Sequence, residues 1–303
     1  MALSIHTNYS SLVTQTNLSK TNNALGTNQQ RLGTGLRINS AADDAAGLQI
    51  ATRLNAQSRG MAVAMRNTND AVSLLQTAEG AFSEMTNILQ RMKDLATQSA
   101  NDTNSQADRD SLQAEYDQLG SEMANIFLNT SYAGDTLFSN GTEIAGATGK
   151  FGAAAVNFQI GATTAEKMSV DLTTATGSGA LGDLATALSG LSTMFDLPAT
   201  AAAGTEISTQ AGANGMIDTV SAALDSVGSL RAQFGATINR LNYVNNNLAN
   251  MKDNTEMAKG RIMDADFASE SASMTKNSML LQSGISMLKQ AGQMPGMVMG
   301  LLG

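Results

Sequence analysis

This chain of 303 residues has few side chains of the kinds that build catalytic or metal sites. It contains no cysteine and a single histidine, His6. Without cysteine there is neither a thiolate metal site nor a disulfide framework. His6 has no neighbouring ligands, and no His-Glu-x-x-His pattern occurs, so a zinc site lacks its required donors. We therefore predict a protein that is not an enzyme and that holds no metal and no cofactor.

The pair Gly33-Thr-Gly35 is the nearest approach to a phosphate-binding loop. A dinucleotide or nucleotide loop needs a preceding strand and a further glycine at fixed spacing, and both are missing here. Glycine adopts the left-handed conformation that ends many helices. We therefore interpret this pair as a helix stop, followed by a helix whose first turn is capped by Ser40 with Asp43 and Asp44 close behind.

Arg91, Leu95 and Glu115 form a second candidate group. Arg91 and Leu95 are four residues apart and so share one face of a helix, and Glu115 belongs to the next helix of a helical hairpin. The plain interpretation is an ordinary helix surface that makes protein–protein contacts.

The elements that position these residues are mostly long helices. Between residues 4 and 32, apolar residues recur at six- and seven-residue intervals: Ile5, Leu12, Leu18, Leu25 and Leu32. Polar residues fall between the leucines, namely Gln15, Asn22 and Gln29. The segment is either a solvated amphipathic helix or one half of a coiled coil with polar layers, which lower stability but fix the register.

The C-terminal part of the chain carries a matching pattern. A helical period returns at Met216, and after residue 266 apolar residues step by seven through Phe267, Met274, Leu281 and Leu288. Ser271, Ser278 and Ile285 are the expected companion positions. Such persistence is typical of a coiled coil, and we predict that the two ends of the chain pair with each other. With so many polar seam residues, we expect both ends to order only on assembly.

The middle of the chain divides into helices and a small irregular part. Residues 41–99 and a helix centred on Leu112 to Ile126 are joined by a short connection, which predicts antiparallel packing. From 130 to about 210 the helical period stops, and alternating runs at 155–160 and 167–172 predict a β-hairpin. A short helix is expected within 177–190.

Charge and hydropathy exclude two classes of partner. The formal net charge of −8 opposes binding to nucleic acid, whose phosphates require a basic face. No run of eighteen apolar residues is present, so no membrane span is predicted. Residues 1–9 lack the charged start and apolar core of a Sec signal peptide. The protein is therefore either cytosolic or exported by a route that reads no cleavable signal.

Several blocks of the sequence resemble bacterial flagellin, in the order in which that family has them. The strongest is Gly35-Leu-Arg-Ile-Asn-Ser-Ala-Ala-Asp-Asp-Ala-Ala-Gly-Leu48, and the others are residues 89–101, 158–162, 229–236, 261–268 and 293–302. The resemblance covers residues 2–172 and 214–303. The opening and the tail resemble lateral-type flagellins, but the tail is rich in methionine where many flagellins have Gln and Ala.

The resemblance implies a mainly α fold with long coiled-coil terminal helices, a helical bundle and a small β-hairpin-rich outer element. It places residues 1–40 and 265–303 in a terminal coiled-coil inner-tube domain. Residues 41–130 and 214–264 would form a helical shell domain, and 131–213 a small, variable outer region. The residues it implies for inner-tube packing are Leu18, Leu25, Leu32, Met274, Leu281, Ile285 and Leu288.

In function, the resemblance implies a structural subunit that polymerises into the flagellar filament after export by the flagellar type III apparatus. The implied partners are other copies of the chain, the flagellar cap and hook-junction proteins, and an export chaperone at the C-terminus. Arg91, Leu95 and Glu115 match the positions through which immunogenic flagellins engage a host flagellin-sensing Toll-like receptor. The alternative functions are a hook-filament junction protein and a secreted coiled-coil adhesin.

Overall fold

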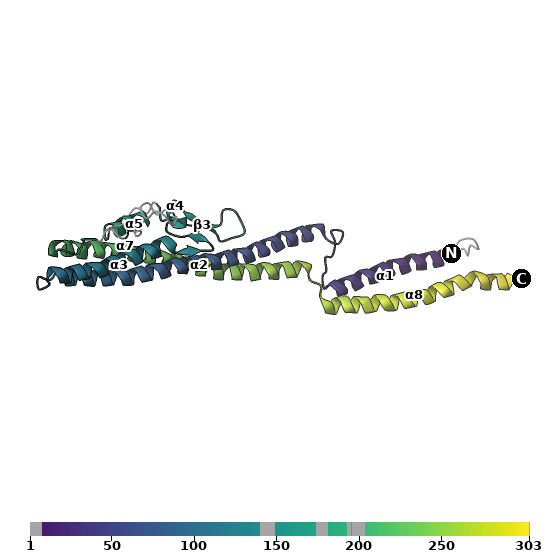
Figure 1. The fold of residues 1–303 in the computed structure, drawn as a ribbon. Coiled ribbons are helices and arrows are strands. Elements are labelled where there is room, and N and C mark those ends of the chain that lie inside the picture. The colour runs from purple at the N-terminus through teal and green to yellow at the C-terminus, as the bar shows by residue number, and fades with distance from the viewer. Residues whose placement is uncertain (1–7, 140–148, 174–180, 193–194, 196–203, 303) are drawn as a thin grey trace. The chain divides into compact units, whose positions relative to one another are not determined.

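The computed structural model describes residues 8–139, 149–173, 181–192, 195 and 204–302 (Figure 1). His6 and the first apolar residue of the N-terminal pattern, Ile5, lie outside them. The chain divides into two compact units, one formed by Met1–Arg59 with Lys252–Gly303 and the other by Gly60–Met251. The predicted inner-tube, shell and outer domains refer to an assembled filament and stay a prediction.

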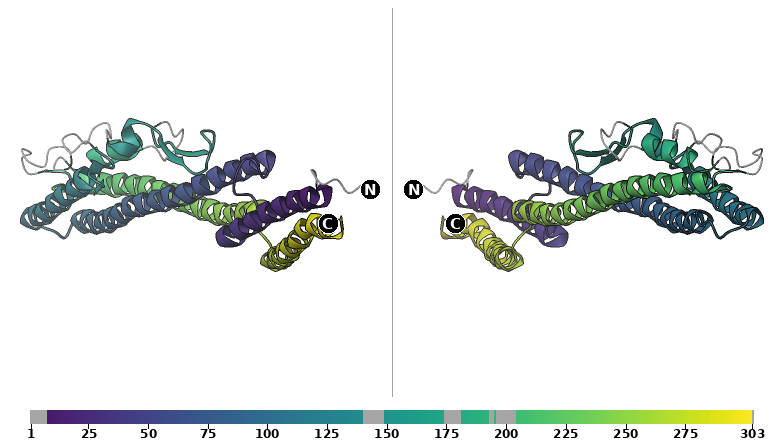
Figure 2. Two further views of the ribbon diagram at one scale, coloured as in Figure 1. Left: turned by 90° about the vertical axis from the view of Figure 1, so that its right-hand side faces the viewer. Right: turned by 90° about the vertical axis from the view of Figure 1, so that its left-hand side faces the viewer.

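The first unit contains the paired ends of the chain. Helix α1 (Tyr9–Thr34) lies beside helix α8 (Phe267–Leu302) in antiparallel orientation (Figures 1 and 2). The start of α2 (Ala45–Ser99) and the end of α7 (Gln210–Met263) belong to the same unit. The prediction that the two ends pair is confirmed.

Local capping residues explain where these helices begin and end. The Asn8 side chain accepts a hydrogen bond from the Ser11 N–H at 3.1 Å and so caps the start of α1. At the other end Gly35 has φ +73°, and its N–H donates to the Arg31 carbonyl, as expected of a left-handed helix stop. Gly33, the other predicted stop residue, lies inside α1.

The cap of α2 differs from the one predicted. Asp44, not Ser40, accepts from the N–H of the third helical residue, Gly47, at 2.8 Å. Ser40 instead donates its N–H and its hydroxyl to Asp43 at 2.9 and 3.1 Å, which closes a turn before the helix. The aspartate next to the helix is the better placed acceptor because α2 begins at Ala45.

The second unit is a helical bundle. The later part of α2 runs antiparallel to α3 (Gln106–Asn129), with a turn at 100–105 between them, and also antiparallel to α7. The α2–α7 orientation follows from their contacts, since Asn245 bonds to Asn69 at 2.7 Å and Arg231 pairs with Glu79 at 3.4 Å. The predicted antiparallel hairpin of α2 and α3 is confirmed.

A chain of phenylalanine rings fills the centre of this bundle. The ring centroids of Phe82 and Phe138 are 4.7 Å apart, and those of Phe82 and Phe234 are 5.6 Å apart. Further ring contacts join Phe127, Phe151 and Phe195 to the same cluster. Each ring is fully buried, so six of the eight phenylalanines of the chain stabilise one core.

The outer element consists of short strands and helices packed on the bundle. Strands β1 (Ser131–Tyr132) and β2 (Asp135–Thr136) form a tight hairpin, and β3 (Val156–Gln159) pairs antiparallel with β4 (Lys167–Val170). Helices α4 (Lys150–Ala153) and α5 (Leu181–Ser189) complete it. The mainly α fold with a small hairpin-rich element is confirmed.

Candidate functional site

The seam between α1 and α8 is the first candidate surface, because it contains most of the residues predicted for inner-tube packing. Leu18, Leu25 and Leu32 on α1 face Met274, Leu281 and Leu288 on α8, and all six are half-buried. Between these apolar layers the seam contains small and polar residues: Ser11, Thr14, Thr21 and Asn28 on α1 and Glu270, Asn277, Gly284 and Ala291 on α8. The spacing alternates by three and four on both helices, as in a coiled coil.

The positions predicted for the polar layers were wrong, each by one residue. Gln15, Asn22 and Gln29 are exposed, and their preceding neighbours Thr14, Thr21 and Asn28 occupy the seam. The same shift occurs on α8, where Ser271, Ser278 and Ile285 are exposed. The residues one position earlier, Glu270, Asn277 and Gly284, occupy the seam instead. The Gly284 position matters, because a Cβ there would lie 2.9 Å from the Leu18 Cδ1.

Specific polar contacts fix the alignment of α1 against α8. With its amide oriented to satisfy its surroundings, Asn28 donates to the Ala24 carbonyl at 3.1 Å and accepts from the Asn277 amide at 3.2 Å. Arg31 lies 3.5 Å from Glu270, and the Asn8 amide donates to the Ala291 carbonyl at 2.6 Å. Asn28 with Asn277 and Arg31 with Glu270 each join two particular side chains across the seam, so both favour this alignment over a shifted one.

The sides of α1 and α8 that point away from the seam carry several exposed apolar residues among polar ones. On α1 the exposed apolar side chains are Tyr9, Leu12 and Val13, and on α8 they are Phe267, Met279, Leu280, Ile285 and Met287. A helix that is apolar on more than one side is normally surrounded by protein. The pair therefore offers apolar surface beyond the surface that it buries within one chain.

The block at 35–48 connects α1 to α2 and bonds to the end of α7. Leu36 forms an antiparallel bridge with Asp264, and the Arg37 N–H donates to the Met263 carbonyl at 2.6 Å. The Arg37 guanidinium donates to the Ile262 carbonyl at 2.9 Å. These bonds satisfy the last carbonyls of α7. The helix therefore ends, and α8 begins separately, where residues 35–48 cross.

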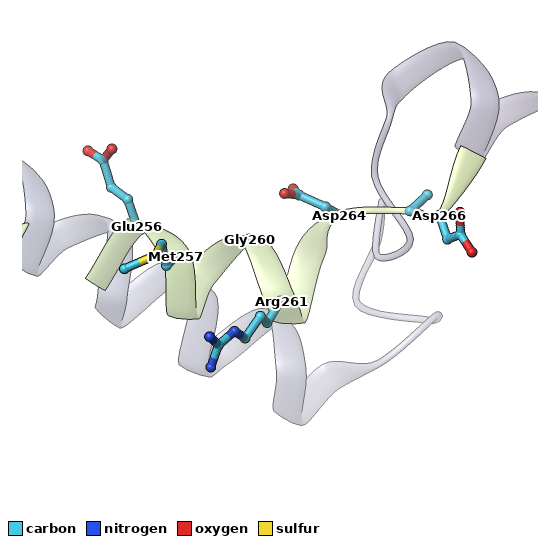
Figure 3. A pocket seen from close by; sticks show the side chains of 7 residues that line it. Glu256, Met257, Gly260, Arg261, Asp264 and Asp266 are labelled. Carbon is cyan, nitrogen blue, oxygen red and sulfur yellow. The ribbon is translucent and has the colours of Figure 1, made fainter. Parts of the chain in front are cut away.

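An open hollow of ≈ 640 Å³ lies along the end of α7 next to this block, lined by Glu256, Met257, Gly260, Arg261, Asp264, Ala265 and Asp266. Figure 3 shows that the Asp264 and Asp266 carboxylates point in different directions and that Arg261 points away from Glu256. The Ser58 hydroxyl and Lys252 hold the pKa of Glu256 below its ordinary value. The charges do not converge on one point, so the hollow has no geometry for chemistry.

The second candidate surface is formed by Arg91 and Glu115. Arg91 on α2 donates through Nε and Nη2 to one oxygen of Glu115 on α3, at 2.8 and 2.6 Å. Both side chains are about half exposed, at 53% and 45%. Leu95 is only 1% exposed and belongs to the core of the bundle. The structure thus brings Arg91 and Glu115 together on the surface and places Leu95 beneath it.

The cap of α3 was not among the predicted helix starts. Ser105 and Asp108 form a capping box, in which the Asp108 N–H donates to the Ser105 hydroxyl oxygen and the Ser105 N–H donates to the Asp108 carboxylate. The Ser105 hydroxyl also donates to this carboxylate at 2.7 Å, and these bonds lower the pKa of Asp108. The pattern of a serine followed three residues later by an acidic residue was the available signal.

No reactive site emerges from the part of the chain that the structure describes. Within it, no three His, Asp or Glu side chains are grouped so that they could bind a metal ion. Among the helices of these residues, none combines the length and the apolarity that a membrane crossing requires.

Comparison with known proteins gives the family of this chain. The family model for the bacterial flagellin N-terminal helical region matches residues 5–142, and the model for the C-terminal helical region matches residues 217–302. Flagellin A of Vibrio anguillarum is 36% identical over 390 aligned residues, and Polar flagellin C of Vibrio parahaemolyticus is 35% identical over 394. Both alignments cover all of this chain and all of the relative.

One solved structure shows the same kind of fold. A putative flagellar hook-associated protein from Vibrio parahaemolyticus aligns with a TM-score of 0.56 at 15% identity, covering 73% of this chain and 100% of that one. Bacillus cereus flagellin aligns with a TM-score of 0.47 at 30% identity, covering 60% of this chain and 88% of that one. From the two family models and the full-length relatives, we conclude that this chain belongs to the bacterial flagellins.

Proposed function

We propose that this chain, a structural subunit of the extracellular bacterial flagellar filament used for motility, contacts neighbouring copies through the outward faces of α1 and α8. The supporting observation is the exposed apolar surface on these helices, above all Leu280 and Ile285 on α8. Large exposed apolar patches mark protein–protein contacts. Ile285, which lies outside the seam of one chain, would then pack between subunits.

Seeded polymerisation tests this proposal. The double variant Leu280→Gln/Ile285→Gln should keep the helix content of the monomer and lose incorporation into filaments, because each buried Leu or Ile contributes about 1.5–3 kcal/mol. Leu280→Met/Ile285→Val retains apolar side chains and is the matched control, which should assemble. Normal filaments from the Gln variant would show that these faces are not subunit contacts.

The exposed apolar side of α8 also bears on partners other than copies of this chain. We propose that an export chaperone covers the apolar side of α8 before assembly, and that flagellar cap and hook-junction proteins contact the subunits at the two ends of the filament. The support is that α8 exposes apolar side chains over successive turns. Binding of the chaperone should therefore compete with seeded growth. The lateral subtype stays a prediction.

We also propose that Arg91 and Glu115 are recognised by a host flagellin-sensing Toll-like receptor. This proposal is supported by the half-exposed, hydrogen-bonded pair that these two side chains form between α2 and α3. Arginine is also over-represented among the residues that dominate binding. Leu95 would contribute only from below, by supporting this surface from the core. A reporter-cell assay with monomeric protein tests this role.

The alternative of a hook-filament junction protein makes a different prediction for assembly. A junction protein is present in few copies and would not elongate from a seed. Electron microscopy of seeded protein separates the two functions, since the filament subunit gives long filaments whereas a junction protein leaves the seeds unchanged. An adhesin would likewise leave them unchanged.

A further inference from the structure

Among the methionines whose side chains the structure describes, exposure ranges from fully buried to more than half exposed. The chain has 18 methionines and neither cysteine nor tryptophan. Five methionines of the bundle are buried, at most 5% exposed: Met61, Met85, Met92, Met123 and Met168. Four others, all after residue 250, are 41–61% exposed: Met251, Met257, Met279 and Met287.

Met279 and Met287 stand out because both lie on α8, at 61% and 58% exposure. They are eight residues apart, so the two thioethers lie within about a quarter turn of one another. Leu280 is exposed on the same side of the helix. On the proposed function, a second copy of the chain covers this surface in the filament, and the sulfur atoms are then open to solvent only before assembly.

We propose that Met279 and Met287 form an oxidation-sensitive modification site, at which hydrogen peroxide converts the thioethers to sulfoxides and so prevents the subunit from joining a filament. This inference rests on the proposed role of the outward face of α8. In the reaction, a sulfur lone pair attacks one peroxide oxygen, an S–O bond forms and the O–O bond breaks. The departing hydroxide takes up the proton of the transferred oxygen, so one water is released and sulfur loses two electrons.

The composition of the chain directs the oxidant to exposed methionines, two of which, Met279 and Met287, lie on α8. Cysteine is the usual first target of peroxide, and this chain has none. The buried methionines are shielded by the bundle core. The exposed thioethers therefore react first.

The product explains the loss of assembly. A sulfoxide is polar and accepts hydrogen bonds, whereas the surrounding contact surface, represented by Leu280, is apolar. Burying a polar group without a hydrogen-bond donor is costly. The modification is reversible, because methionine sulfoxide reductases restore the thioether, so an oxidised subunit can become competent again.

The test begins with full-length monomer treated with dilute hydrogen peroxide, followed by removal of the peroxide and seeded growth. We expect sulfoxide at Met279 and Met287 by peptide mass spectrometry. The critical concentration for growth should rise about tenfold or more, which corresponds to at least 1.4 kcal/mol. Incubation with methionine sulfoxide reductase and its thiol reductant should restore growth. Filaments treated in the same way should keep both residues unoxidised.

Two double variants locate the effect. Met279→Leu/Met287→Leu removes both thioethers from α8 and should assemble normally after peroxide. Met251→Leu/Met257→Leu, which removes the exposed methionines of α7, is the matched control and should stay as sensitive as the unmodified sequence. Equal sensitivity of both variants would overturn the proposal, as would undiminished growth of protein that is oxidised at Met279 and Met287.

A third variant separates failure of this inference from failure of the proposed function. Met279→Gln/Met287→Gln places permanent polar groups at the two positions. If it assembles normally, Met279 and Met287 are not in a subunit contact and the inference falls, whereas the proposed function is decided by Leu280→Gln/Ile285→Gln. If it fails to assemble while oxidised protein of the original sequence grows normally, the contact is real and the oxidation site alone is refuted.

Discussion

Arg91 directs both its Nε and its Nη2 to a single carboxylate oxygen of Glu115, at 2.8 and 2.6 Å, and this pair joins α2 to α3 on the surface of the bundle. Exposed ion pairs contribute little to folding, typically below about 1 kcal/mol. The pair can therefore be changed with little loss of fold, which makes it a usable probe of recognition.

Arg91→Ala should reduce receptor signalling by monomers while lowering the free energy of unfolding by less than about 1 kcal/mol. Reporter-cell dose–response curves and urea unfolding measure the two effects. Leu95→Ala is unsuitable for this purpose, because truncating a buried leucine costs about 2–5 kcal/mol. An unchanged dose–response for Arg91→Ala would remove Arg91 from the proposed receptor surface.

Asn28→Leu should stabilise the α1–α8 pair. Asn28 is a buried polar layer in the seam, and such a residue lowers coiled-coil stability while fixing register. We expect slower cleavage of α1 by a non-specific protease. Asn22→Leu changes an exposed position of the same helix and serves as the control, with unchanged cleavage. Faster cleavage of Asn28→Leu would mean that its hydrogen bonds contribute more than the polar layer costs.

The free monomer should lose both ends of the chain to limited proteolysis, roughly residues 1–40 and 265–303, while the bundle remains intact. The seam leucines are only half-buried, and polar or small residues separate them. Such a seam gains too little to offset about 1–2 kcal/mol of backbone entropy per residue. The same sites should resist cleavage in filaments. If the ends of the free monomer resist cleavage as well as those in filaments do, a mechanism other than disordered ends must delay assembly.

Asp108→Asn should destabilise the bundle at neutral pH but not in acid. The Ser105 hydroxyl and N–H lower the pKa of Asp108 below its ordinary value of 3.8. A lowered pKa means that the ionised carboxylate stabilises the folded state above about pH 4, and that this contribution is lost as pH falls through the lowered value. Urea midpoints at neutral and acid pH measure the difference.

The matched control for this test is Asp94→Asn, which removes an exposed carboxylate of α2 outside the cap. It should change the urea midpoint little at either pH. If Asp108→Asn shows the same small change at both pH values, the capping box does not contribute to stability in solution.

The sequence by itself determined which parts of this protein are helical and that its two ends pair with each other. Heptad leucines, the stop at Gly35 and the alternating runs of β3 and β4 are local signals, and each depends on backbone geometry within a few residues.

Tertiary structure alone decided which side of each helix is covered. Asn28 rather than Gln29 enters the seam, and Leu95 is buried although Arg91, one turn earlier, is exposed. Adjacent residues on a helix differ by only about 100° in direction, so a pattern read along one helix is uncertain by one position. The covered side is settled by the neighbouring helix, through contacts such as Asn28 with Asn277, and those contacts join residues that are far apart in the sequence.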